Sequence, residues 1–84
     1  MQTITATLVI RTLEPGFHID RKPIAKRPWV VVDLPREECC EVRTDWGEYR
    51  PVLTFPAIFR ALKARGHMPP LDYGEEYQLS IVEN

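Results

Sequence analysis

Eight prolines divide this chain of 84 residues into short segments, and no other feature restricts its fold as strongly. Proline has no backbone N–H and cannot donate to a sheet ladder or a helix interior, so it is found at turns, sheet edges and element starts. The segments between the prolines suit single strands or one short helix. We therefore expect a mainly β chain whose elements begin and end at prolines.

Residues 3–12 form the clearest predicted strand. Their apolar side chains alternate with polar ones, and a period of two is typical of a half-buried strand. The apolar set is Ile4, Ala6, Leu8 and Ile10. Segments rich in β-branched and aromatic residues predict further strands, at residues 29–34, 49–55 and 77–82.

Two segments have weaker patterns. Residues 17–28 are polar and contain two prolines, so we expect an ordered excursion or a ragged hairpin arm there. Residues 37–43 predict a weak strand with Cys40 and Val42 facing inward. A turn is expected at residues 45–48, before the next strand.

Residues 56–65 predict the helix. Pro56 suits its first position, and Gly66 supplies a C-terminal stop. Its apolar stripe consists of Ile58, Phe59 and Leu62. A helix this short is not stable alone in water, so the stripe should pack on the strands. The expected fold is one small domain over residues 1–84, α+β but mainly β, with a barrel-like or rolled antiparallel sheet of about five strands.

Charge and hydropathy argue against several classes of protein. Eleven basic and twelve acidic residues give a formal net charge of −1, which provides no general attraction to nucleic acid or anionic membranes. No apolar run approaches the ~20 residues of a membrane span, so we expect no membrane partner. Residues 1–5 lack the features of a signal peptide, and we expect a cytoplasmic protein.

The two cysteines, Cys39 and Cys40, are adjacent in the sequence. Adjacent side chains of a strand point to opposite faces, so we expect two reduced thiols, one buried and one half-exposed. The pair lacks the spacing of roughly two to four residues found in zinc sites, and the neighbouring glutamates disfavour a thiolate nucleophile. The sequence therefore predicts no metal, no cofactor and no thiol catalysis.

Two histidines leave one enzymatic alternative. His18 lies near a run of cations, and His67 follows the basic end of the helix. Such a pair could cleave RNA without a metal, with one histidine as base and the other as acid. Histidines on loops are more often solvated side chains, so we expect the chain not to be an enzyme.

Aromatic and basic residues gather at the turn expected at residues 45–48. Trp46, Tyr49 and Arg50 are of the types that dominate binding energy at protein interfaces. Strands at the sheet edges could also pair with a strand of a partner. The competing interpretation is that the aromatic side chains cover one end of the sheet.

Nucleic-acid binding is the main alternative. Residues 21–27, the basic arm, carry Arg21, Lys22, Lys26 and Arg27. Trp29 follows the arm and could stack on a base. A second group of this kind is Arg43, Trp46, Tyr49 and Arg50. Against this alternative, a pI near 6.1 is not typical of a protein that binds phosphate backbones.

Short stretches in the N-terminal half follow one another as strand, acidic turn, excursion and strand. They are Ala6-Thr7-Leu8-Val9-Ile10, Leu13-Glu14-Pro15-Gly16 and Lys26-Arg27-Pro28-Trp29-Val30-Val31-Val32-Asp33, with Leu71-Asp72-Tyr73-Gly74-Glu75-Glu76-Tyr77 later in the chain. In this order they resemble the translation-factor β-barrel domain of elongation factor Tu, although Lys26 stands where that family has an aromatic residue and the Gly-Gly-Arg of its turn is missing. The resemblance implies a small β-barrel that docks partners and has no catalytic residues.

The C-terminal half has a pattern of its own, which runs strand, proline, short helix, acidic turn and strand. It comprises Val52-Leu53-Thr54-Phe55-Pro56-Ala57-Ile58-Phe59-Arg60-Ala61-Leu62 and Gly74-Glu75-Glu76-Tyr77-Gln78-Leu79-Ser80-Ile81. This half resembles the swapped-hairpin modules of the AbrB and SymE type, with a longer connector at residues 67–73. The resemblance implies a homodimer whose basic loops contact DNA.

The sequence thus favours a small non-catalytic binding or regulatory module that acts on a protein partner. An inhibitor or adaptor of the kind encoded by phages and mobile elements fits this size. The alternatives left open are an AbrB-like or SymE-like nucleic-acid-binding regulator that uses the basic arm and, more distantly, a metal-independent ribonuclease that uses His18 and His67.

Overall fold

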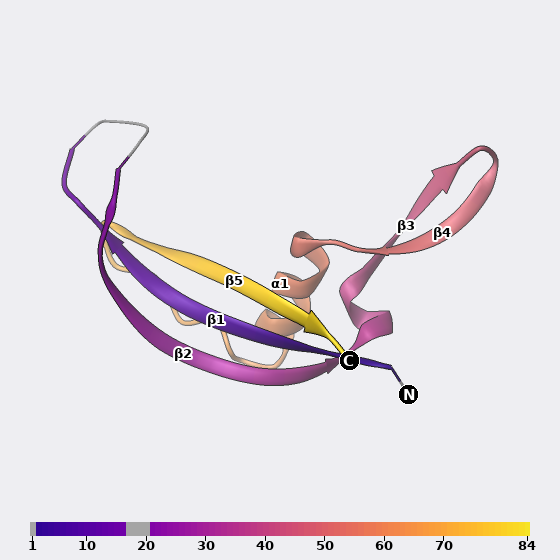
Figure 1. Cartoon of the computed structure of the whole chain (residues 1–84), viewed down its shortest axis with the longest axis horizontal. Helices are drawn as coiled ribbons and strands as arrows, with labels where there is room; N and C mark the ends of the chain where they lie inside the picture. The colour runs from indigo at the N-terminus through magenta and orange to yellow at the C-terminus, as the bar shows by residue number, and fades with distance from the viewer. Residues whose placement is uncertain (1, 17–20) are drawn as a thin grey trace.

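The computed structural model describes residues 2–16 and 21–84, and it is mainly β with one short helix, as the sequence predicts (Figure 1). The strands are β1 (Thr3–Leu13), β2 (Pro23–Pro35), β3 (Cys40–Asp45), β4 (Glu48–Leu53) and β5 (Glu75–Glu83). The 3-10 helix η1 (Arg36–Cys39) precedes β3, and helix α1 (Phe55–Ala64) follows β4. The strands form two antiparallel sheets, of order β2-β1-β5 and β3-β4, and the described residues form no closed barrel.

The central strand of the larger sheet, β1, has two faces of opposite character. Every second side chain is at most 1% exposed, as the period of two predicts, and these are Ile4, Ala6, Leu8 and Ile10. On the opposite face polar groups bond to one another: Thr5 Oγ1 donates to Asp33 Oδ1 at 2.7 Å, and Asn84 Nδ2 donates to Thr3 Oγ1 at 2.9 Å. One covered and one solvated face are typical of antiparallel sheets.

The ragged arm predicted at residues 17–28 is, in its described part, a continuation of the second strand. β2 begins at Pro23 rather than near Trp29, and among the described strands it pairs with β1 alone. Edge strands tolerate proline, especially at bulges. The register of β1 against β2 shifts at the two places where β1 meets Pro28 and Pro23. The prolines therefore mark irregularities within an edge strand and do not end it.

Helix α1 begins within one residue of the predicted position. Thr54 is its N-cap, and the Thr54 hydroxyl accepts a hydrogen bond from the Ala57 backbone N–H at 3.3 Å. Pro56 occupies the first turn, where its missing N–H needs no partner inside the helix.

The end of α1 is a Schellman motif around Gly66. Gly66 has a φ of 75° and donates its N–H to the Lys63 carbonyl, while the His67 N–H reaches the Leu62 carbonyl. A left-handed backbone at this position favours glycine, because a Cβ would clash with the following carbonyl. The predicted C-terminal stop is confirmed.

The core lies between α1 and one face of the larger sheet. Ile58 and Leu62 are fully buried, and the half-buried Phe59 ring lies 6.2 Å from the Tyr77 ring. The buried cluster consists of Ile4, Ala6, Leu34, Cys39, Ile58, Ala61 and Leu62. Burying one aliphatic side chain stabilises a fold by roughly 1.5–3 kcal/mol, so packing on the sheet stabilises a helix that is too short to form alone.

The segment between the two sheets differs from its prediction. It begins with η1, and β3 starts only at Cys40. Cys39 is buried, Cys40 is half-buried and both thiols are free, as predicted. Val42 was expected to face inward, which is wrong because its side chain is 69% exposed. The reason is visible in Figure 1, where β3 and β4 project away from the larger sheet.

The molecule is elongated, with extents of 45 × 28 × 20 Å. The larger sheet and α1 form its body, and the β3–β4 hairpin forms one end (Figure 1). Within the described ranges, no helix has the length and apolar character needed to cross a membrane.

Candidate functional site

The hairpin of β3 and β4 is the most exposed regular structure in the described chain. We define the outer hairpin as residues 42–52; all of its described side chains are exposed. The apolar ones are Val42 at 69%, Trp46 at 98%, Tyr49 at 78% and Val52 at 39%. A two-stranded hairpin is marginally stable in water without a packed face, so an exposed apolar set here calls for an explanation outside folding.

The cross-strand register gives the outer hairpin two different faces. Val42 lies opposite Pro51 and Thr44 lies opposite Tyr49, so these four side chains share one face. Arg43 lies opposite Arg50 and therefore belongs to the other face, because neighbouring side chains of a strand point in opposite directions. One face is mainly apolar, and on the other the Arg43–Arg50 pair lies between the pairs Glu41–Val52 and Asp45–Glu48.

The tip of the hairpin has an unusual backbone. Asp45 pairs with Glu48, which leaves Trp46 and Gly47 as a two-residue loop with φ of 52° and 80°. Two positive φ values are those of a type I′ turn, in which asparagine, aspartate or glycine is the usual first residue. A bulky residue in this conformation is an outlier, and a left-handed backbone costs a non-glycine residue roughly 1–2 kcal/mol.

The base of the hairpin is fixed to the body of the molecule. Arg60 of α1 pairs with Glu41 of β3 at 3.4 Å, and the Thr54 N–H reaches the Cys39 carbonyl at 3.3 Å. Leu53, at the end of β4, packs against the buried cluster. The outer hairpin is thus an extension held at one end, and its tip is free of contacts among the described residues other than those within the hairpin.

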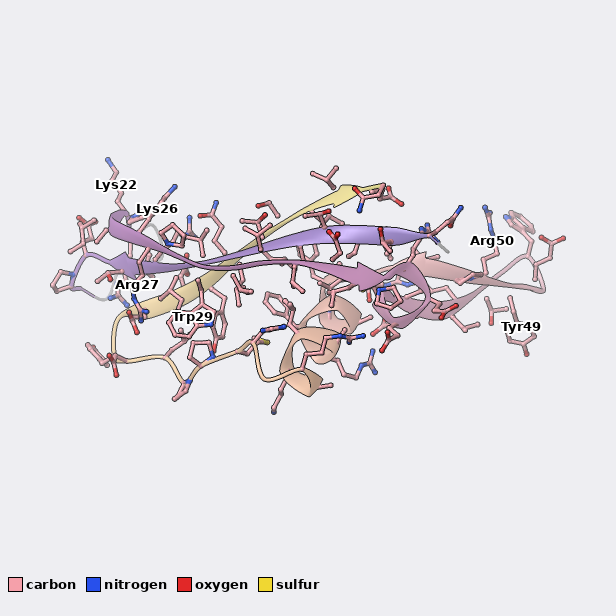
Figure 2. All side chains as sticks on the ribbon, turned by 90° about the horizontal axis from the view of Figure 1, so that it is seen from below. Lys22, Lys26, Arg27, Trp29, Tyr49 and Arg50 are labelled. Atoms are coloured by element: carbon pink, nitrogen blue, oxygen red, sulfur yellow. The ribbon has the colours of Figure 1, made fainter. Side chains whose placement is uncertain are left out.

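The predicted protein-binding residues all lie on this extension but not on one face: Tyr49 belongs to the mainly apolar face and Arg50 to the other. Trp46 is at the tip, and Tyr49 and Arg50 are on β4. Figure 2 shows Tyr49 and Arg50 at one end of the long axis. The interpretation that Trp46 and Tyr49 cover one end of the sheet is wrong, since both side chains are more than three-quarters exposed.

The residues predicted for nucleic-acid binding lie at the opposite end of the molecule. Figure 2 shows Lys22 and Lys26 pointing to one side of the sheet, and Arg27 and Trp29 to the side that carries the helix. The alternation of side chains along β2 separates them in this way. The cations of the basic arm therefore do not converge on one surface.

Two of these cations also have partners within the fold. Arg27 pairs with Glu75 at 3.1 Å and lies over the Trp29 ring, 5.4 Å from its centroid. Arg21 donates from Nε to the Glu14 carbonyl at 2.7 Å. Lys22 and Lys26 are exposed. Trp29 is 45% exposed and stacks with a cation of its own chain.

The candidate catalytic groups do not assemble into a site that the structure describes. His18 lies outside the described residues, and His67 donates its backbone N–H at the end of α1. Burial, together with the neighbouring Cys40 and Glu38, raises the pKa of the Cys39 thiol, which disfavours a reactive thiolate. Among the described residues, no three histidine, cysteine or acidic side chains group as metal ligands would.

A cavity that the sequence did not predict lies at the inner part of the hairpin. Its volume is about 610 Å³, and its charged lining residues are Arg36, Arg43, Arg50 and Glu83. Arg36 belongs to η1 and Glu83 to the end of β5. No sequence motif connects residues this far apart, so their proximity could not be predicted. Only their position beside the hairpin brings them together.

Comparison with known proteins gives no relative from which to infer a function: no family model, no curated protein and no solved structure matches the chain. The resemblances to the translation-factor barrel and to the AbrB and SymE modules therefore stay predictions.

Proposed function

We propose that this chain is a small non-catalytic binding module, an inhibitor or adaptor that recognises a protein partner through its outer hairpin. The observation that carries the proposal is Trp46, which is 98% exposed and holds a φ of 52° at the hairpin tip. Folding explains neither property, because Trp46 contributes no burial and its residue type disfavours the turn.

The rest of the outer hairpin supports the same proposal. Tyr49 and Val42 add exposed apolar surface on one face of the hairpin, and tryptophan, tyrosine and arginine are enriched among residues that dominate interface energies. A partner that covers this surface would supply the second layer that the two-stranded hairpin lacks.

A protein partner is favoured over nucleic acid by the distribution of charge. The basic arm divides its cations between two sides of the sheet, and Arg27 is paired with Glu75. On the hairpin, Glu48 directly follows the Trp46-Gly47 loop and is exposed. Its carboxylate would repel a phosphate backbone that approached the tip. To bind nucleic acid, the chain would have to bring the cations of the basic arm to one surface and break the Arg27–Glu75 ion pair.

The test is capture of a partner from cells of the source organism with matched aromatic variants. Trp46→Ala and Tyr49→Ala should each lose the captured protein, whereas Tyr73→Ala should retain it. Tyr73 is a suitable control because it is 94% exposed but lies outside the hairpin. With the purified partner, Trp46→Ala should weaken Kd by roughly thirtyfold or more, the effect of about 2 kcal/mol at an interface hot spot.

Two results would contradict the proposal. One is a partner whose affinity is the same for the wild type and both hairpin variants. The other is retention of nucleic acid that weakens steeply with salt and is lost when Lys22 and Lys26 are replaced by glutamate.

A further inference from the structure

The arginines of this chain divide into two groups. Arg11, Arg27, Arg36, Arg60 and Arg65 each pair with a glutamate, and Arg21 bonds to a backbone carbonyl. Arg43 and Arg50 form no ion pair and no side-chain hydrogen bond with any described side chain. Both of these arginines lie on the outer hairpin.

The register places these two arginines directly opposite one another. Like charges directly opposite one another destabilise a sheet, and the nearest carboxylates on this face of the hairpin, those of Glu41 and Glu48, belong to the next pair to either side. An anion bound between two guanidinium groups would remove the repulsion and accept charge-assisted hydrogen bonds from both. The pair is therefore suited to a negatively charged ligand.

Arg43 and Arg50 line the same cavity of about 610 Å³, together with Arg36 and Glu83. Arg36 is already paired with Glu83 at 3.3 Å, which leaves the charge of Arg43 and Arg50 uncompensated by the cavity's own residues. The remaining lining is Thr44, Pro51, Val52 and Leu53, which adds an apolar wall to the basic one. A volume of this size lies in the range of clefts that bind a ligand of the size of a drug molecule.

We propose that this cavity binds an acidic, aliphatic segment of the protein partner, with a glutamate or aspartate carboxylate between Arg43 and Arg50. The proposal rests on the proposed function and adds the chemistry of the partner. Apolar side chains of the segment, and the methylene groups of a glutamate, would pack against Val52, which shares the face of Arg43 and Arg50.

The same cavity is less suited to a nucleic acid. None of its lining residues is aromatic, so it offers no surface on which a base could stack. Glu83 lines the cavity, and Glu48 is exposed further along the hairpin. Both carboxylates would repel an extended phosphate backbone. A single carboxylate needs only the space between the two arginines.

The proposal can be tested with two fluorescent peptides of leucine and serine that differ only in one central residue, which is glutamate in one and glutamine in the other. By fluorescence anisotropy the glutamate peptide should bind at least about tenfold more tightly, and added salt should weaken it. Arg43→Gln and Arg50→Gln should each weaken it by roughly tenfold. Lys22→Gln is the matched control, since Lys22 is exposed and lies at the opposite end of the molecule, outside the cavity, and it should bind like the wild type.

Trp46→Ala separates this proposal from the proposed function. Trp46 does not line the cavity, so this variant should keep the affinity for the glutamate peptide although it loses the captured partner. Equal binding of the two peptides, no binding at about 1 mM, or unchanged binding in both arginine variants would overturn the acidic-segment proposal. Tighter binding of an oligothymidine that is lost in the same variants would assign the cavity to phosphate instead.

Discussion

The body of the molecule and its outer hairpin use their apolar residues in opposite ways. In the body, one apolar face of β1 packs with the apolar stripe of α1, and Ile4, Ala6, Ile58 and Leu62 are fully buried there. In the outer hairpin, every described side chain is exposed, and the tip residue has a backbone that its residue type disfavours. The burial of apolar side chains explains the body, whereas it does not explain the exposed apolar side chains of the outer hairpin.

The largest expected difference between the regions is in the effect of truncating an apolar side chain. Leu62→Ala should lower the free energy of unfolding by about 2–5 kcal/mol, because it leaves a cavity beside fully buried neighbours. Val42→Ala should change it by less than about 0.5 kcal/mol, since the Val42 side chain is mostly exposed. Urea unfolding followed by circular dichroism measures both. Similar losses in the two variants would show that the hairpin is packed in solution.

A second comparison uses two threonines. Thr54→Ala removes the N-cap of α1 and should cost about 1 kcal/mol. Thr44→Ala, on the exposed hairpin, should cost only a few tenths of a kcal/mol, the usual result for a surface site. The same unfolding measurement applies. If Thr54→Ala had no effect, α1 would be stabilised by its packing alone.

The third prediction concerns the hairpin tip, where stability and binding should change in opposite directions. Trp46→Asn places a residue favoured in type I′ turns at a φ of 52° and should stabilise the hairpin by up to about 1 kcal/mol. Slower hydrogen exchange of the hairpin amides would measure this gain. Affinity for the captured partner should fall at the same time. If the hairpin amides of this variant exchanged as fast as in the wild type and its affinity for the partner were unchanged, the functional argument for Trp46 would be removed.

The smallest expected effect is a pH dependence of stability that comes from Glu75 in the body. The Asp72 backbone N–H and then Arg27 donate to Glu75 and lower its pKa. Because the folded pKa lies below the unfolded one, this contribution to stability is complete above the ordinary pKa of a glutamate. It is lost as the pH falls through the folded pKa.

Unfolding midpoints of the wild type and of Glu75→Gln should therefore differ at neutral pH and converge in acid. A constant difference between the wild type and Glu75→Gln at all pH values would mean that the Glu75 carboxylate charge does not contribute.

Much of the body could be predicted from local sequence. The alternation of residues 3–12 identified β1 and its buried face, and Pro56 and Gly66 set the limits of α1. These signals are reliable because a covered sheet face and a helix end impose requirements on adjacent residues. The course of β2 from Pro23 was less clear, since prolines inside a strand are tolerated only where pairing leaves one edge free.

The candidate site was predictable in its residue types but not in its geometry. Trp46, Tyr49 and Arg50 were identified because tryptophan, tyrosine and arginine beside a turn are typical of interfaces. The burial of these three side chains depends on whether another element packs on the hairpin. The inward direction predicted for Val42 assumes such an element, and none of the described elements covers this side chain. The roles of Arg36 and Glu83 in the cavity could not be found by reading along the chain.

The sequence by itself determined the mainly β character, the helix and its ends, and the state of the two cysteines, because these depend on contacts between near neighbours. Only the tertiary structure decided that the strands separate into two sheets, that one hairpin extends from the body, and that Arg43 and Arg50 share a cavity with the end of β5. The physical reason is that burial of a side chain depends on what packs against it, and the packing partners here are distant in sequence.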